Sequence, residues 1–142
     1  MDEFQNELLH ATVELGKIPY RFGGNDQDVG LDCSSYIQKI YDSVGVSLPR
    51  STREQVNDNR FETVKLSQRN SGDLIFFKNT YRKGVSHVGI FIDAHYFAHA
   101  SSSDKQIVIE NFEKSRYFQK RFFKLKRLKT EFRMPASVHQ DS

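Results

Sequence analysis

The first part of the chain carries hydrophobic residues at helical spacing. Phe4, Leu8, Ala11 and Leu15 recur every three or four positions, which is the period of one face of a helix. Gly16 follows them, and glycine commonly stands where a helix ends. A helix is therefore predicted over residues 2–15, with Gly16 as its C-cap.

A second helical pattern runs from Cys33 to Val44 and ends at Gly45. Asp32 stands directly before it, and aspartate is a favoured N-cap residue. The pattern predicts a helix with one apolar stripe, made of Tyr36, Ile37, Ile40, Tyr41 and Val44.

The segments next to this second helix have turn chemistry. Residues 17–32 contain one proline, three glycines and several Asp and Asn residues, so a loop is expected there. After Pro49, Ser51 and Glu54 have the spacing of a capping box, which predicts a short third helix.

From residue 74 onward the pattern changes to short β-rich runs separated by turn residues. Because helices come first and strands second, we expect an α+β domain with N-terminal helices packed on a central antiparallel sheet. Residues 1–134 would form this single domain, and residues 135–142 a flexible tail. The predicted strands are residues 74–77, 86–93, 96–101, 106–112 and 116–128.

Composition excludes several classes of protein. The chain has 142 residues, one cysteine and a net charge of +3, so it has neither an internal disulfide nor a cysteine-based zinc site. No stretch approaches the roughly 20 apolar residues of a membrane span. The basic, aromatic segment 114–129 is interpreted as a closing strand with Lys and Arg in water, so no nucleic-acid partner is expected.

The single cysteine has two interpretations. Cys33 would lie in the first turn of its helix, where the positive end of the helix dipole favours a thiolate. Free cysteine is also among the most buried residue types, so the position of Cys33 alone slightly favours a packing role. A nucleophilic cysteine needs a base, which turns attention to the histidines.

His87 and His99 lie in two apolar runs that are predicted to pair as a hairpin. Strand side chains alternate between faces, so the loop length decides whether both histidines share a face. With a three-residue loop at residues 93–95, Ile92 pairs with Tyr96 and the two histidines become diagonal neighbours on one face. A two-residue loop would place them on opposite faces.

The same face carries Gly89, which we expect to leave space for a helix end to approach the sheet. This arrangement suits a thiol lying over the sheet, with His87 as general base and His99 orienting its ring. Alternatively, His99 is a core histidine without a role. His95 and His99 have the spacing of helical zinc motifs, but their segment has β and turn character, so no metal is expected.

Six short motifs occur in order along most of the chain, namely PYRFGG, LDCSSYIQKIY, VSLPRSTREQ, SGDLIFF, SHVGIFI and YFAHAS. Cys33 lies 54 positions before His87, and His87 lies 12 positions before His99. With these motifs and intervals, the sequence resembles the NlpC family of papain-like cell-wall peptidases.

The resemblance implies a role for each matched residue. Cys33 would attack the scissile amide, His87 would be the base, and His99 would orient His87. The backbone N–H of Cys33 and the hydroxyl of Tyr20 would hold the oxyanion, which is reasonable chemistry for such donors. The substrate groove would be lined by Asp32, Ser34 and Ser86.

The resemblance also implies the reaction and its setting. The expected activity is hydrolysis of peptidoglycan stem peptides, at the bond between D-γ-glutamyl and a diamino acid, through a Cys33 thioester and without a cofactor. We expect a monomer acting in the cell envelope or periplasm, or secreted. The acidic N-terminus is not a signal peptide as it stands, so the sequence alone leaves three possibilities: a cytosolic protein, export by another route, or a leader outside this chain.

Two departures from the family pattern leave alternatives open. Ser35 stands where the family usually has glycine, and we expect it to narrow the groove beside the sulfur. We also expect no wall-binding module before the catalytic segment, so targeting would depend on the domain itself, a partner or a segment outside this sequence. An antibacterial toxin with an immunity partner, a phage lysin, an amidase or acyltransferase on a non-wall substrate, and a non-catalytic scaffold remain alternatives.

Overall fold

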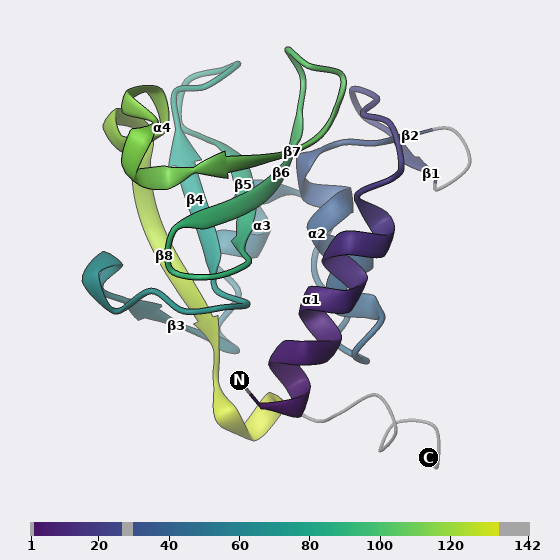
Figure 1. Ribbon diagram of the computed structural model, residues 1–142, viewed down its shortest axis with the longest axis vertical. Coiled ribbons are helices and arrows are strands. Elements are labelled where there is room, and N and C mark those ends of the chain that lie inside the picture. Colours follow the sequence, from purple (N-terminus) through teal and green to yellow (C-terminus); the bar gives the residue numbers. More distant parts are fainter. Residues whose placement is uncertain (1, 27–29, 134–142) are drawn as a thin grey trace.

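The fold is given by a computed structural model, which describes residues 2–26 and 30–133 (Figure 1). The predicted tail at 135–142 and the domain limit at 134 lie outside the described residues. Of the helices in the described ranges, none is long and apolar enough to cross a membrane.

Three helices occur in the first part of the chain, as predicted. α1 (Glu3–Leu15) is capped by Asp2 and ends at Gly16. α2 (Cys33–Asp42) begins at the nucleophile candidate and is shorter than predicted by two residues, because the chain turns at residues 43–45, where Gly45 has a φ of 80°. α3 (Thr52–Val56) is capped by the predicted Ser51.

The strands form an antiparallel sheet of six in the order β3-β8-β4-β5-β6-β7. The expected α+β architecture is thereby confirmed. The sequence pattern did not reveal β3, a short edge strand, nor the small hairpin β1–β2 within the expected loop. The strands are β1 (Asn25–Asp26), β2 (Gly30–Leu31), β3 (Phe61–Val64), β4 (Leu74–Lys78), β5 (Val85–Phe91), β6 (Tyr96–Ser101), β7 (Gln106–Asn111) and β8 (Phe122–Leu128).

The prediction of a single strand over residues 116–128 is wrong. A helix, α4 (Arg116–Arg121), precedes β8. Ser115 caps this helix by accepting a hydrogen bond from the backbone N–H of Phe118. The amide of Gln119 donates to the carbonyl oxygens of Phe112 and Glu113, which fixes the helical turn. Short 3₁₀ turns complete the fold at Leu66–Gln68, Phe112–Lys114 and Thr130–Phe132.

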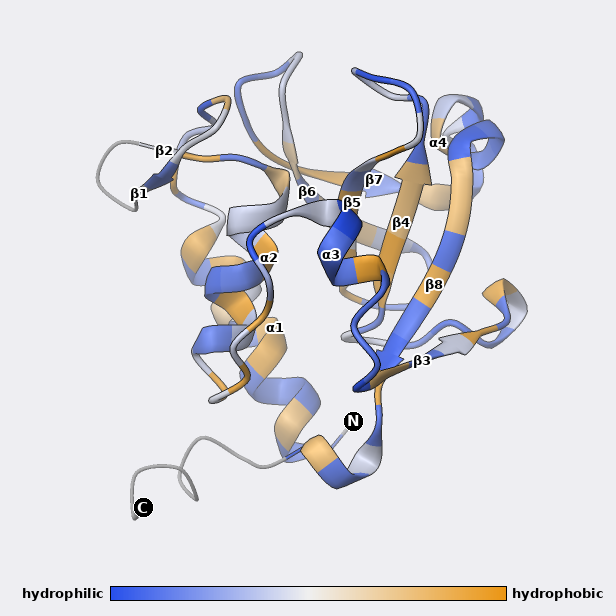
Figure 2. Ribbon diagram, turned by 180° about the vertical axis from the view of Figure 1, so that it is seen from behind, coloured by the Kyte–Doolittle hydropathy of each residue, from blue (hydrophilic) through white to orange (hydrophobic). Residues whose placement is uncertain are grey.

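The sheet separates two hydrophobic cores, because neighbouring side chains of each strand point to opposite faces. One core packs α1 and α2 against Phe76 and Val88. The other packs α4, through Phe118, against Phe77 and Phe97. Figure 2 shows β4, which lies between the two cores, as hydrophobic along most of its length.

Several connections meet at one end of the molecule (Figure 1). The loop between β4 and β5, the loop between β6 and β7 and the segment that leads into α2 all lie at the upper end in this view. The N-terminus of α2 therefore faces a region built from parts of the chain that are distant in sequence.

Candidate active site

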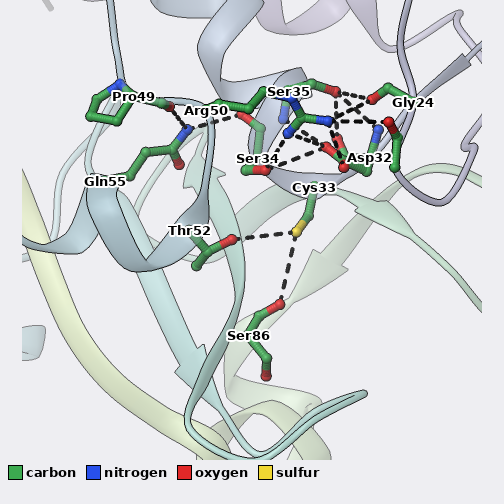
Figure 3. Close-up of polar contacts among 11 residues, drawn as sticks. Gly24, Asp32, Cys33, Ser34, Ser35, Pro49, Arg50, Thr52, Gln55 and Ser86 are labelled. Carbon is green, nitrogen blue, oxygen red and sulfur yellow. Dashed lines mark hydrogen bonds and ion pairs between the residues drawn. The ribbon is translucent and has the colours of Figure 1, made fainter.

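Cys33 is the first residue of α2 and is 6% exposed. Its Sγ lies 3.7 Å from the hydroxyl of Thr52 and 3.9 Å from the carbonyl oxygen of Ser86 (Figure 3). Ser86 precedes His87 on β5, so the thiol lies against the backbone that carries the candidate base.

The thiol and the two histidines approach from different sides of the sheet. Cys33 belongs to the core on the α2 side, whereas the rings of His87 and His99 contact Phe118 in the α4-side core. β5 and β6 pair only at Ile90–Ala98 and Phe91–Phe97 in the described ladder. The thiol therefore contacts β5 at Ser86, in the part of the strand for which no pairing with β6 is described. It does not lie over the histidine face, as had been expected.

The predicted hairpin register is confirmed. The backbone N–H of Ile92 donates to the carbonyl of Tyr96 at 2.9 Å, which leaves a three-residue loop. His87 and His99 consequently share a face, and His87 Nε2 lies 2.9 Å from His99 Nδ1. This contact uses Nε2 of His87, so Nδ1 is the ring nitrogen of His87 that does not contact His99.

Gly89 has a different role from the one expected. A Cβ there would lie 2.8 Å from a ring carbon of Phe97 and 3.0 Å from the carbonyl oxygen of Ala98. Both belong to β6, so the glycine allows β6 to approach β5 closely. The helix end does not use this space.

Aromatic rings fix the orientation of the histidine pair. His87 stacks on Phe118 at 5.8 Å between centroids and 23° between planes. His99 meets the same ring edge-on at 5.0 Å, and the two imidazoles are nearly perpendicular at 86°. Phe118 on α4 thus holds both rings, a role hidden by the wrong strand prediction for this segment.

Burial makes the neutral forms of the thiol and the imidazole the stable ones. Burial raises the pKa of Cys33, and this outweighs hydrogen bonds from Thr52 and from the backbone N–H groups of Val88 and Ser34, which lower it. Burial, and then the neighbouring His99, lower the pKa of His87 well below 6.5. The thiolate expected from the helix dipole is therefore not the resting form.

The lowered pKa of His87 predicts a loss of stability in acid. Below about pH 6.5 the unfolded chain binds a proton at His87 that the folded chain does not. The free energy of unfolding should therefore fall as the pH drops from 7 to 5, by up to about 1.4 kcal/mol per pH unit. Urea denaturation at pH 5, 6 and 7 measures this slope. His87→Gln should flatten it, and an unchanged slope in that variant would contradict the assignment.

Tyr20 lies close to the thiol. Burial, followed by the charges of Cys33, Asp32 and Tyr81, raises the pKa of its phenol to about 12. The hydroxyl is therefore protonated at neutral pH and able to donate. Among the described residues, no backbone acceptor takes the N–H of Cys33, so this N–H at the start of α2 is able to donate to a substrate.

The predicted groove residues Asp32 and Ser34 are held by Arg50 (Figure 3). The guanidinium donates to both carboxylate oxygens of Asp32, at 3.1 and 2.9 Å, and to the hydroxyl of Ser34 at 2.9 Å. Ser35 is fully buried, and its hydroxyl donates to the carbonyl of Gly24 at 2.7 Å. Ser35 therefore secures the start of α2 and does not narrow a groove, contrary to expectation.

Loss of the Arg50 side-chain charge should loosen the start of α2. Arg50→Met would leave the carboxylate of Asp32, which is 16% exposed, without its paired guanidinium. We expect the free energy of unfolding to fall by about 2 kcal/mol. Chemical denaturation checks this, with Arg53→Met on the exposed side of α3 as the matched control. Equal stability of the two variants would contradict the prediction.

The third predicted groove residue, Ser86, is fully buried. Its hydroxyl lies 2.6 Å from that of Thr80 and accepts the backbone N–H of Thr80 at 3.0 Å. These contacts anchor the loop between β4 and β5. A substrate would thus meet Ser86 through its backbone, or after these contacts open.

A hollow of about 440 Å³ opens on the histidine side. His87 and His99 line it, together with Tyr81 and Glu110, and Cys33 is not among its described lining residues. Tyr81 also contacts Phe22 edge-on at 5.9 Å, which joins the loop between β4 and β5 to the loop before α2. Within residues 2–26 and 30–133, no cluster of three or more His, Cys, Asp or Glu is placed to hold a metal ion.

Sequence reasoning did not single out several residues of this site. Thr52 contacts the sulfur, Arg50 holds Asp32, and the amide of Gln55 donates to the carbonyl oxygen of Ser34 at 3.0 Å. All three lie in the motif VSLPRSTREQ, so the resemblance marked the segment without indicating which atoms it would contact.

Curated proteins with similar sequences are named as cell-wall enzymes. A probable endopeptidase of Haemophilus influenzae is 36% identical over 122 residues, covering 85% of this chain and 73% of that protein. The murein DD-endopeptidase MepS/murein LD-carboxypeptidase of Escherichia coli is 33% identical over 139 residues, covering 89% and 69%. The gamma-DL-glutamyl hydrolase of Bacillus subtilis is 39% identical over 89 residues, covering 62% of this chain but only 21% of that protein.

The fold has close counterparts among solved structures. An NLP/P60-family protein of Staphylococcus aureus, described as similar to a lipoprotein, superimposes with a TM-score of 0.79 and 32% identity, covering 90% of this chain and 42% of that one. The chain spans 21% and 27% of two Bacillus subtilis relatives. The model of the NlpC/P60 family matches residues 16–127, which is most of the chain. The chain therefore belongs to the NlpC/P60 family, whose chemistry is that of cysteine peptidases.

Proposed function

We propose that this chain is a cysteine endopeptidase that hydrolyses amide bonds in the peptide stems of peptidoglycan. The observation that carries the proposal is the thiol of Cys33 at the start of α2, against the strand that carries His87, itself bonded to His99. The relatives named as murein endopeptidases and as a gamma-DL-glutamyl hydrolase support the substrate class.

In the proposed acylation step, Cys33, His87 and two hydrogen-bond donors act together. The sulfur of Cys33 attacks the amide carbon while its proton passes to Nδ1 of His87. The developing oxyanion accepts hydrogen bonds from the backbone N–H of Cys33 and the phenol of Tyr20. The carbon–nitrogen bond then breaks, the leaving amine takes the proton from His87, and a thioester remains on Cys33.

Deacylation reverses these roles. Water attacks the thioester carbon as its proton passes to Nδ1 of His87. The carbon–sulfur bond breaks, the proton returns to Cys33, and the new carboxylic acid leaves. His99 acts throughout as the orienting group, because its Nδ1 faces Nε2 of His87. No metal or other cofactor enters these steps.

We place the cut at the bond between D-γ-glutamyl and the diamino acid of the stem. The name of the Bacillus subtilis gamma-DL-glutamyl hydrolase supports this bond. The names of the Escherichia coli relatives point instead to DD-endopeptidase activity. For either bond, we expect the reaction to take place in the cell envelope or periplasm, or outside the cell.

Digestion of defined muropeptides tests the proposal. Purified monomeric stems and cross-linked dimers are incubated with the protein, and the products are identified by mass spectrometry. We expect monomeric stems to be cut after D-γ-glutamate, releasing a peptide that begins with the diamino acid. Conversion of dimers into intact monomers would assign the DD bond instead. Folded protein that leaves both substrates uncut would contradict the proposed substrate.

A further inference from the structure

His99 has a hydrogen-bond partner for only one of its two ring nitrogens. Its Nδ1 lies 2.9 Å from Nε2 of His87. Its Nε2 is buried and has no hydrogen-bond partner among the described residues, and the whole residue is 2% exposed. A buried polar group without a hydrogen-bond partner costs about 1–3 kcal/mol of stability. When a native structure contains such a group, a structural or functional explanation should be sought.

The carboxylate of Glu110 is the ionic group next to this nitrogen. Its Oε1 lies 3.6 Å from Nε2 of His99. Glu110 is on β7 and pairs with Phe97 of β6. Directly paired residues share a face, so Glu110 projects on the histidine side and lines the same hollow as His87 and His99. The other carboxylate that lines the hollow, Asp104, accepts from the hydroxyl of Ser101 instead, at 2.9 Å.

The protonation of the histidine pair follows from the proposed reaction. If Nδ1 of His87 takes the thiol proton, its neutral ring must carry its own proton on Nε2. That N–H then donates to Nδ1 of His99, so His99 must carry its proton on Nε2. This second N–H is the one that points to Glu110, and an ionised carboxylate can only accept.

We propose that Glu110 is a positioning residue that accepts the Nε2–H of His99 and thereby selects the tautomers in which His87 keeps its Nδ1 free for the thiol. The inference rests on the proposed function. The 3.6 Å separation exceeds the roughly 2.7–2.9 Å of a charge-assisted hydrogen bond by less than about 1 Å. The Glu110 side chain is 35% exposed, and a small rotation of it would close this gap.

Glu110→Gln tests the inference with little change in shape. A glutamine amide both donates and accepts, so it no longer selects one tautomer of His99. Glu113→Gln is the matched control, because Glu113 contacts the ring of the exposed His95 and lies outside the site. The first readout is ¹⁵N NMR of the imidazole nitrogens, which distinguishes a protonated from an unprotonated nitrogen without any substrate.

We expect His99 of the unchanged protein to be protonated on Nε2 only, and to become a mixture of tautomers in Glu110→Gln. In muropeptide cleavage, kcat should fall about tenfold with KM nearly unchanged, whereas Glu113→Gln should keep both. An unchanged tautomer signal in Glu110→Gln overturns the inference whatever the activity. Absent cleavage by the unchanged protein would instead refute the proposed substrate, since the NMR readout does not depend on it.

Discussion

Replacement of Cys33 by alanine is expected to lower the rate of stem-peptide cleavage at least about ten-thousandfold. The variant lacks the atom that forms the thioester, and the two oxyanion donors that remain cannot replace it. The side chain of Cys33 is small and buried. The alanine variant should therefore keep the same fold and lose about 1 kcal/mol in free energy of unfolding. The rate is measured by chromatography of muropeptide products.

Thermal unfolding of the same Cys33→Ala preparation provides the control. A melting temperature near that of the unchanged protein, together with lost cleavage, assigns the loss to chemistry. Cleavage that persists within about tenfold in the folded variant would exclude Cys33 as nucleophile. The activity would then have to come from a different group of the site.

The replacement of His87 by glutamine should lower kcat by about a thousandfold. Burial holds the thiol of Cys33 in its neutral form, so a base must remove its proton during the attack. Glutamine cannot do this. KM should change far less than kcat, because the ring of His87 acts on the thiol and not on substrate binding. Steady-state kinetics on one purified muropeptide separate the two parameters.

The matched control for this variant is His95→Gln. His95 lies in the loop between β5 and β6 and its side chain is 59% exposed. This variant should keep the activity of the unchanged protein. A His87→Gln variant as active as His95→Gln would show that another group deprotonates Cys33.

The neutral resting pair distinguishes this site from one with a preformed thiolate. The raised pKa of Cys33 and the lowered pKa of His87 have the same main cause, which is burial on either side of β5. The thiol should therefore react slowly with small alkylating agents at neutral pH. A stem peptide that brings its carbonyl to the sulfur allows the proton to move to His87 in the same step.

Much of the fold is visible in the sequence. The helical stripes predict α1 and α2, and Asp32 marks the N-terminus at which Cys33 lies. The odd loop between β5 and β6 predicts that His87 and His99 share a face. These features depend on local spacing and on strand alternation, which a sequence expresses directly.

The features that escaped prediction depend on contacts between distant segments. Alternating aromatic and basic residues hid α4, whose Phe118 packs against two histidines from distant strands. The approach of the thiol from the α2 side depends on the packing of α2 against the sheet, which brings the sulfur to the carbonyl oxygen of Ser86. The structural role of Ser35 depends on its hydrogen bond to the carbonyl oxygen of Gly24, which lies in the loop before α2.

Acid quenching during turnover tests the central claim most directly. An activated ester of L-alanyl-γ-D-glutamate makes acylation fast, so the covalent intermediate should accumulate before hydrolysis. Mass spectrometry of the quenched protein is predicted to show the added mass of the acyl group on the peptide that contains Cys33, and none in Cys33→Ala. An acyl group on another residue, or equally fast turnover by Cys33→Ala, would contradict the account.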